Sequence, residues 1–320
     1  MMRSPLTVIA VCSVALFQIG CDRDHDAPDS TPLEQDAIVE VTDSQLQSVL
    51  VNDYEINYLD IGDGEAVVFV HGGLGDYRTW KAQIDAFSRD YRIIAISRRY
   101  AYPNKQEEND SNDYSVTPHA EDLAQLLKTL DLGPVHLVGH SYGAFTSLLT
   151  ALEHPELIRS LTLGEPPVMS LLANIPDGGV AGSEFAQNVL APTAQAFLSG
   201  NDEKAVQLFI SGVLGDSDYF SNAPEEQKEL MMSNAFGLRG VILTENPFPL
   251  LNCESVSNLQ TPTLLIKGDR SPKVFGEIAN VLAQCIEDSE LAILSDASHG
   301  LEYENPVEFN RIVIDFIGKN

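Results

Sequence analysis

Short, continuous apolar runs alternate along most of the chain with longer stretches in which apolar residues recur three and four positions apart. A continuous run bounded by turn residues is typical of a strand buried on both faces, and the longer spacing indicates an amphipathic helix. Their alternation predicts an α/β domain. The expected strands are residues 66–70, 92–96, 135–138, 160–163, 263–266 and 291–294, after shorter runs at 38–41, 49–51 and 56–59. The expected helices are residues 79–88, 117–130, 144–152, 274–285 and 306–317.

Residues 168–255 depart from this alternation. They lack buried-strand runs and contain helical stretches, separated by glycine and proline, near residues 183–198, 202–213 and 224–236. The insert begins just after a strand, and ligands bind at the carboxyl ends of the strands in open α/β sheets. We therefore expect residues 37–167 and 256–320 to form one core in two parts, and residues 168–255 to form a helical cap that walls a pocket and excludes water.

The beginning of the chain resembles an export signal. Residues 6–17 form an apolar run that is short for a membrane span and has the length of a signal-peptide core, so residues 1–20 are the expected signal peptide. Ile19-Gly20-Cys21 resembles a bacterial lipobox, although Gln18 stands where that pattern usually has leucine. The resemblance implies a lipid on Cys21, and a plain secretory signal is the alternative. Polar residues 21–36 are the expected disordered tether. These features predict an exported, lipid-anchored protein on the periplasmic side of the cell envelope.

Charge and cysteine content narrow the partners and the compartment. The chain has 19 basic and 47 acidic residues and a formal net charge of −28 at pH 7. A field of this sign repels nucleic acid and anionic lipid headgroups, so we expect no nucleic-acid partner and no membrane binding by charge. Cys253 lies in the expected cap, and Cys285 lies in the expected core. In an exported protein these two thiols could pair, and two separate buried thiols are the alternative.

The chemistry-bearing motif is Gly139-His140-Ser141-Tyr142-Gly143. An apolar run precedes it and a helical run follows it, which predicts a sharp strand–turn–helix connection with Ser141 at its apex. A serine hydroxyl is a weak nucleophile, so it must be exposed, held still and placed beside a base. The flanking glycines let neighbouring backbone pass closely. Ser141 is the predicted nucleophile, and an ordinary turn capped by serine is the alternative.

From Asp53 to Phe316 the chain resembles the α/β-hydrolase superfamily. The resemblance is carried by the Ser141 motif together with three further stretches. They are His71-Gly72-Gly73, Thr261-Pro262-Thr263-Leu264-Leu265 with Gly268, and Ala297-Ser298-His299-Gly300. Residues 98–103, 165–167 and 268–272 look like a bacterial subgroup that lacks the usual late-strand aspartate. The resemblance implies a mostly parallel, eight-stranded sheet with helices on both faces.

In this architecture the nucleophile, acid and base follow one another along the chain, so the base must lie after Ser141. The histidines after that position are His154 and His299. His154 stands at the far end of the helix that follows Ser141, about 20 Å away at the rise of an α-helix. His299 follows the last strand and would lie at the same sheet end as Ser141. It is the predicted general base.

Two carboxylates follow strand ends and compete for the role of the acid. Many relatives carry the acid three residues beyond the glycine that ends the later strand, and here that position is Ser271. A serine cannot stabilise an imidazolium by charge. Glu165, in the rigid sequence Glu165-Pro166-Pro167, is therefore the favoured acid, and Asp269 is the alternative.

A glycine-rich loop follows the first buried strand, at His71-Gly72-Gly73-Leu74-Gly75. In this fold class that loop supplies one half of the oxyanion hole, so we expect the backbone N–H groups of Gly73 and Tyr142 to be the donors, with Leu74 as the alternative to Gly73. Tyr100 and Tyr102 follow another strand end and are predicted, together with Leu74, to line the substrate pocket.

These residues predict a serine hydrolase that cleaves carboxylic esters of small to medium apolar substrates through an acyl-enzyme. The sequence contains no pattern of metal ligands and no phosphate-binding loop, so no cofactor or metal is expected. A C–C bond hydrolase with the same triad is the alternative. A binding protein that kept the fold without the chemistry is the alternative of a different class. The pattern does not determine the oligomeric state.

Overall fold

The computed structural model describes residues 43–109 and 111–320. The predicted signal peptide, tether and lipid-bearing Cys21 lie outside these residues, as does the short apolar run at 38–41. In the described part of the chain, no helix combines the length and the apolar character that a membrane crossing requires.

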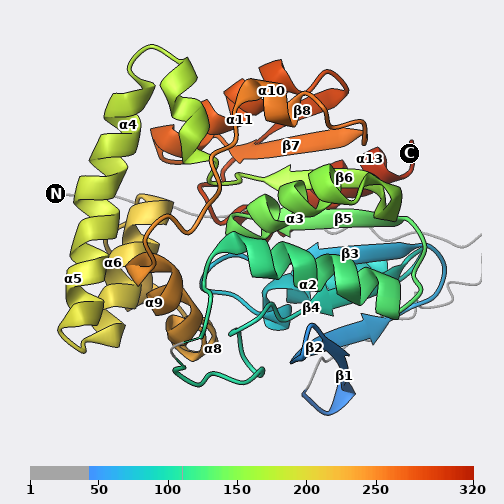
Figure 1. Cartoon of the computed structure of the whole chain (residues 1–320), viewed down its shortest axis with the longest axis horizontal. Coiled ribbons are helices and arrows are strands. Elements are labelled where there is room, and N and C mark those ends of the chain that lie inside the picture. The colour runs from blue at the N-terminus through green and yellow to red at the C-terminus, as the bar shows by residue number, and fades with distance from the viewer. Residues whose placement is uncertain (1–42, 110) are drawn as a thin grey trace, which may run out of the picture. The chain divides into compact units, whose positions relative to one another are not determined.

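An eight-stranded sheet in the order β1-β2-β4-β3-β5-β6-β7-β8 forms the centre of the fold. The strands from β4 to β8 in that order are parallel, and β2 is antiparallel to both of its neighbours. The predicted mostly parallel sheet is therefore confirmed (Figure 1). The strands are β1 (Leu46–Val51), β2 (Tyr54–Ile61), β3 (Ala66–Val70), β4 (Arg92–Ile96), β5 (Val135–His140), β6 (Ile158–Gly164), β7 (Thr263–Gly268) and β8 (Ser289–Leu294).

Helices cover both faces of this sheet, and the central strands β3 and β5 are buried at every position. In β3, for example, Val68 and Val70 belong to the core beneath α2, α3 and α11, whereas Val67 and Phe69 belong to the core beneath α1 and α13. The helices of the core are α1 (Lys81–Phe87), α2 (Val116–Thr129), α3 (Tyr142–Glu153), α11 (Lys273–Cys285), α12 (Leu301–Glu304) and α13 (Pro306–Ile317). Short 3₁₀ helices occupy Asp43–Gln45, Tyr77–Trp80, Pro155–Leu157 and Met169–Asn174.

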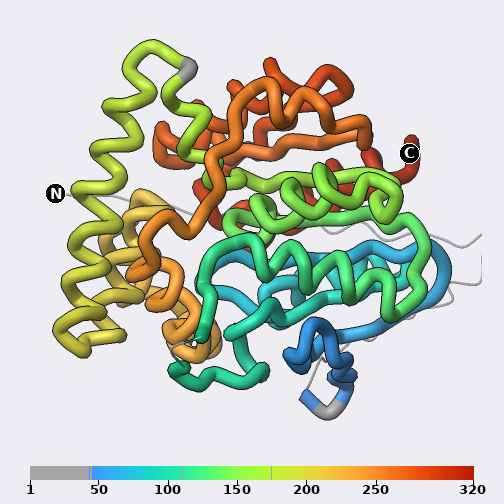
Figure 2. The backbone as a smooth tube through the Cα atoms, viewed as in Figure 1, coloured from blue at the N-terminus to red at the C-terminus, as the bar shows by residue number. Residues whose placement is uncertain are grey.

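Between β6 and β7 the chain makes one long helical excursion, which lies beside the carboxyl ends of the parallel strands (Figures 1 and 2). Its first part is a continuous column in which a π-helical turn, Ala186–Leu190, joins α4 to α5. Pro192 is the second residue of α5. Because proline cannot donate a backbone hydrogen bond, the helical hydrogen-bond pattern changes in the π-helical turn before it. The helices are α4 (Gly178–Phe185), α5 (Ala191–Leu198), α6 (Asp202–Leu214), α7 (Tyr219–Asn222), α8 (Glu225–Ser233), α9 (Ala235–Leu243) and α10 (Cys253–Val256).

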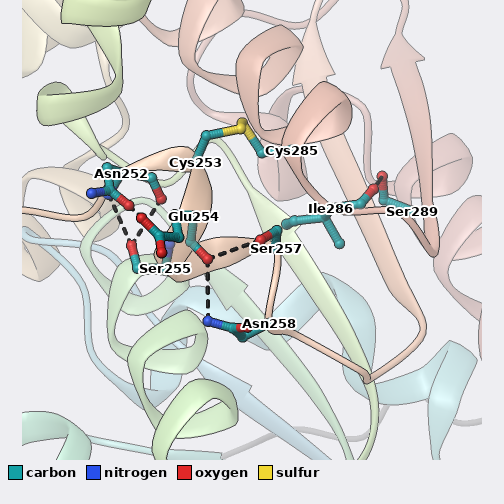
Figure 3. Close-up of a disulfide and its surroundings, with 9 residues drawn as sticks. All are labelled: Asn252, Cys253, Glu254, Ser255, Ser257, Asn258, Cys285, Ile286 and Ser289. Carbon is teal, nitrogen blue, oxygen red and sulfur yellow. Dashed lines mark hydrogen bonds between the residues drawn. A yellow bond between two sulfur atoms is a disulfide. The ribbon is translucent and has the colours of Figure 1, made fainter.

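A disulfide joins the end of this excursion to the core. Cys253, the first residue of α10, is bonded to Cys285, the last residue of α11 (Figure 3). The two cysteines are 32 positions apart in sequence and their Cα atoms are 5.2 Å apart. Asn252 caps α10 through reciprocal hydrogen bonds with Ser255. The crosslink and the cap together fix the segment that leads into β7.

Reduction of this disulfide is expected to lower the free energy of unfolding by about 2–4 kcal/mol, because the reduced, unfolded chain gains the freedom of the loop that the bond closes. Urea unfolding with and without dithiothreitol measures the change. The double variant Cys253→Ala/Cys285→Ala is the control, and the reductant should leave its unfolding midpoint unchanged. An equal effect of reductant on both proteins would contradict the assignment.

Candidate active site

The turn between β5 and α3 presents Ser141 in a strained conformation. Its backbone angles are φ 52° and ψ −121°, in the region that residues with a side chain rarely adopt. The close packing around the turn needs the glycines on either side. A Cβ atom on Gly143 would lie 2.1 Å from the carbonyl oxygen of Val70, and one on Gly139 would lie 2.6 Å from that of Gly143. The N–H of Ser141 donates to the oxygen of Gly164 at 2.7 Å, which anchors the turn to β6.

A chain of two hydrogen bonds joins Ser141, His299 and Glu165. Nε2 of His299 lies 2.9 Å from Oγ of Ser141, and Nδ1 lies 2.6 Å from Oε2 of Glu165. Glu165 is fully buried, and its second oxygen accepts the N–H of Gly268 at 2.9 Å. Asp269 lies at the surface, where Oδ1 accepts the N–H of Ala297 at 3.3 Å. The structure thus places Glu165, and not Asp269, against His299.

Separate contacts hold the His299 ring and the loop that carries it. It stacks on Phe275, with ring centroids 3.9 Å apart and planes 18° apart, and its loop is held by Glu304, whose carboxylate accepts from the N–H and the hydroxyl of Ser298. Burial lowers the pKa of His299 below its usual value, and the hydrogen bond and charge of Glu165 offset part of that effect. The imidazole is therefore neutral at neutral pH and can accept a proton.

The glycine-rich loop after β3 lies against the serine. A Cβ atom on Gly72 would be 3.3 Å from Cβ of Ser141, and Gly73 and Leu74 line the same cavity as Ser141. Tyr142 is the first residue of α3, and the first N–H groups of a helix have no carbonyl partner within it. These are the positions from which the predicted oxyanion donors would act.

A buried arginine that the sequence analysis did not single out holds this loop. Arg98 donates from its guanidinium to the carbonyl oxygens of His71 at 2.9 Å and Gly72 at 2.8 Å, and the guanidinium lies 4.4 Å from the centre of the Tyr142 ring. Burial lowers the pKa of Arg98 to about 10, so the side chain stays charged at neutral pH. The signal in the sequence was its position two residues after the end of β4.

A cavity of about 530 Å³ opens beside Ser141 and His299. Core residues, among them Gly73 and Leu74, form its floor. The excursion between β6 and β7 supplies apolar walls from α6 and α8, namely Phe209, Ile210, Val213, Leu214, Leu230 and Met231. The helical pattern of residues 168–255 predicted a pocket beside these helices but not the side chains that line it. The excursion therefore has the position of a cap over the site.

The prediction that Tyr100 and Tyr102 line this pocket is wrong, since neither is among the described residues that surround the cavity. Tyr100 is buried in an aromatic cluster, with its ring 4.6 Å from that of Tyr114. Tyr102 lies beneath the guanidinium of Arg78, and its N–H donates to the side chain of Asn234. Both tyrosines support the packing of the cap against the core instead of facing substrate.

Comparison with known proteins agrees with the fold. A family model described as the alpha/beta hydrolase fold matches residues 65–306. The serine hydrolase BPHL of Mus musculus is 24% identical over 275 residues, 84% of this chain and 85% of that protein. The 2-hydroxy-6-oxo-6-phenylhexa-2,4-dienoate hydrolase of Comamonas testosteroni is 25% identical over 83% of this chain and 92% of that protein. The esterase EaEST of Exiguobacterium antarcticum has a TM-score of 0.68 at 19% identity, over 85% of this chain and 98% of its own.

The chain belongs to the α/β-hydrolase family and is a hydrolase of that fold, because the family model spans most of its length. Within residues 43–109 and 111–320, no group of three or more His, Cys, Asp or Glu side chains could hold a metal ion.

The lowered pKa of His299 predicts how the reactivity of Ser141 depends on pH. A protonated His299 cannot take the serine proton, so the rate of labelling by a fluorophosphonate should rise with pH and reach half its plateau below pH 6.5, the usual pKa of histidine. Labelling rates between pH 4.5 and 8.5 test this, with circular dichroism to show that the protein stays folded. A midpoint above pH 7 would show that burial does not govern this histidine.

Proposed function

We propose that the protein is a serine hydrolase that cleaves carboxylic esters of small to medium apolar substrates. The observation that carries this proposal is the buried line of hydrogen bonds from Glu165 through His299 to Ser141, which ends in a cavity with apolar walls. Nucleophile, base and orienting acid in this arrangement are the requirements for acyl transfer.

In the proposed reaction, Oγ of Ser141 attacks the ester carbonyl carbon while Nε2 of His299 takes the hydroxyl proton. The backbone N–H groups of Gly73 and Tyr142 donate to the oxyanion that forms. The intermediate collapses to the acyl-enzyme, and His299 gives its proton to the departing alkoxide, which leaves as the alcohol. Water then attacks the acyl carbon with His299 again as base, and the acid is released with Ser141 restored.

The charges around the cavity favour a neutral ester over an anionic substrate. Within the described residues, Arg78 and Lys81 are the arginine and lysine side chains at the cavity. Arg78 is ion-paired with Asp76 at 2.7 Å and Lys81 with Glu226 at 2.8 Å. The Comamonas testosteroni relative is named for a dienoate, which carries a carboxylate. Carbon–carbon bond hydrolysis with the same three residues is the second candidate, because the Comamonas testosteroni relative named for that substrate is 25% identical over 83% of this chain.

Turnover of p-nitrophenyl esters by four proteins tests the proposal. Ser141→Ala should abolish turnover, and Glu165→Gln should lower kcat by about 10³–10⁴-fold because the imidazole loses its orienting charge. Asp269→Asn, which removes the competing, exposed carboxylate, should stay within about twofold of wild type, as surface substitutions usually do. Cleavage of the phenylhexadienoate without ester turnover would select the second candidate. No turnover of either substrate by the folded wild type would favour a binding protein.

We further propose that the protein is exported and anchored at the cell envelope through a lipid on Cys21. The support is the apolar run at residues 6–17 followed by Ile19-Gly20-Cys21. Expression of Cys21→Ala in a bacterium should move the protein from the membrane fraction to the soluble fraction, because the acyl chains have no attachment point. A variant that remains wholly in the membrane fraction would contradict the lipid anchor.

A further inference from the structure

Two buried side chains donate hydrogen bonds to the carbonyl oxygen of Gly72. Nη2 of Arg98 lies 2.8 Å from this oxygen, and Nδ1 of His71 also lies 2.8 Å from it. A carbonyl oxygen only accepts, so Nδ1 of His71 carries the hydrogen, and Nε2 accepts the backbone N–H of Arg98 at 2.9 Å. The N–H of Gly75 adds a longer bond to the same oxygen, at 3.4 Å. Several donors therefore fix the direction of this carbonyl.

The peptide unit that contains this carbonyl also contains the N–H of Gly73. In a trans peptide the C=O and the N–H point in opposite directions, so an oxygen held by Arg98 directs the N–H away from Arg98. Gly73 lines the cavity together with Ser141, whereas neither Arg98 nor His71 is among the described residues around it. The hydrogen bonds of the described residues include none from the N–H of Gly73. This N–H is therefore available to an oxyanion in the cavity.

Arg98 carries a positive charge that no carboxylate balances within the described part of the chain. The side chain is 7% exposed. Nη1 lies 3.3 Å from Nδ1 of His119, and burial lowers the pKa of that histidine well below its usual value, so it is neutral. The adjacent Arg99, by contrast, donates to both carboxylate oxygens of Asp122 at 2.7 Å. A buried charge without a counterion is costly for folding, so its presence beside the site points to a role in function.

We propose that Arg98 is a positioning residue for the oxyanion hole, which directs the Gly73 N–H and strengthens it as a donor through the Gly72 carbonyl. A charged donor at the oxygen end of a peptide polarises the amide and increases the positive partial charge on its hydrogen. The oxyanion forms only during the reaction at Ser141, so the effect falls on the transition state and not on the bound ester. This inference rests on the proposed ester hydrolysis and adds a residue that does not touch the substrate.

Three substitutions of Arg98 separate its charge from its hydrogen bonds. Arg98→Met removes both, Arg98→Gln keeps an amide donor without the charge, and Arg98→Lys keeps the charge with an ammonium donor. The full chain is assayed with p-nitrophenyl esters, and circular dichroism shows that each variant is folded. Arg98→Met should lower kcat by about 10–100-fold, less than the loss of an oxyanion donor itself, and should leave KM within about threefold of wild type. Arg98→Lys should retain more activity than Arg98→Gln.

A trifluoromethyl ketone provides a readout that a merely structural role would not change. Oγ of Ser141 adds to the ketone carbon, the serine proton passes to His299, and the resulting oxyanion lies where that of the reaction lies. Its Ki should rise across the three variants by the factor by which kcat/KM falls, because both report stabilisation of the oxyanion. The matched methyl ketone stays largely unreacted, so its Ki should change by less than about threefold.

Arg99→Met is the matched control. It removes the neighbouring guanidinium and leaves Asp122 without its ion pair, so it should lower stability. Because Arg99 does not donate to the Gly72 carbonyl, kcat of the folded variant should stay within about twofold of wild type. If Arg98→Met does not fold, the comparison of Arg98→Lys with Arg98→Gln provides the test.

Four results would overturn the role of Arg98. They are an unchanged kcat in Arg98→Met, a rise in KM alone, a lower kcat with an unchanged Ki for the trifluoromethyl ketone, and an Arg98→Lys variant no more active than Arg98→Gln. If the wild type cleaves esters and the variants show one of these results, the role of Arg98 fails and the ester hydrolase stands. If the folded wild type neither cleaves esters nor binds the trifluoromethyl ketone, the proposed function fails and this inference fails with it.

Discussion

The buried carboxylate of Glu165 is the constraint on which the site depends. It follows β6, one oxygen accepts the N–H of Gly268 at the end of β7, and the other faces His299 in the loop after β8. A carboxylate this deeply buried is tolerable only when donors satisfy it. The same contacts that stabilise Glu165 therefore fix the ends of three neighbouring strands relative to one another. His299 is then oriented toward the strained turn that carries Ser141.

Polar contacts away from Ser141 and His299 hold the cap on this core. Asn234, in the connection between α8 and α9, is buried and donates to Asp76 at 2.7 Å, and Asp76 also binds Arg78. Lys81 of α1 pairs with Glu226 of α8 at the surface, where an ion pair contributes little to stability. The core carries Ser141, His299 and Glu165, and the cap places apolar side chains of α6 and α8 around the cavity beside Ser141.

The elements that a short stretch of sequence determines were predicted from the pattern of that stretch. The buried strands, the amphipathic helices and the turn at Ser141 each have a signal within a short window, and His299 followed from chain order within the resembled architecture. The choice between Glu165 and Asp269 had a weaker signal, the rigid sequence Glu165-Pro166-Pro167, which favoured Glu165 and left Asp269 as the alternative. Both follow strand ends, and only the spatial neighbourhood of β6, β7 and the His299 loop places Glu165 inside and Asp269 at the surface. Which side chains form the cavity walls depends on how α6 and α8 are oriented about their axes on the core. The periodicity of the sequence does not define that orientation. Tyr100 and Tyr102 were misplaced for the same reason, because a loop after a strand end can pack against the cap instead of facing the ligand.

The central claim is that Ser141 is a nucleophile activated by His299. The most direct test is to trap it with a fluorophosphonate and to locate the adduct by peptide mass spectrometry. The structure predicts one adduct per chain, on Ser141 in the peptide that contains residues 139–143, and no adduct after acid unfolding. A folded protein that forms no adduct, or forms it on a different residue, would contradict the claim.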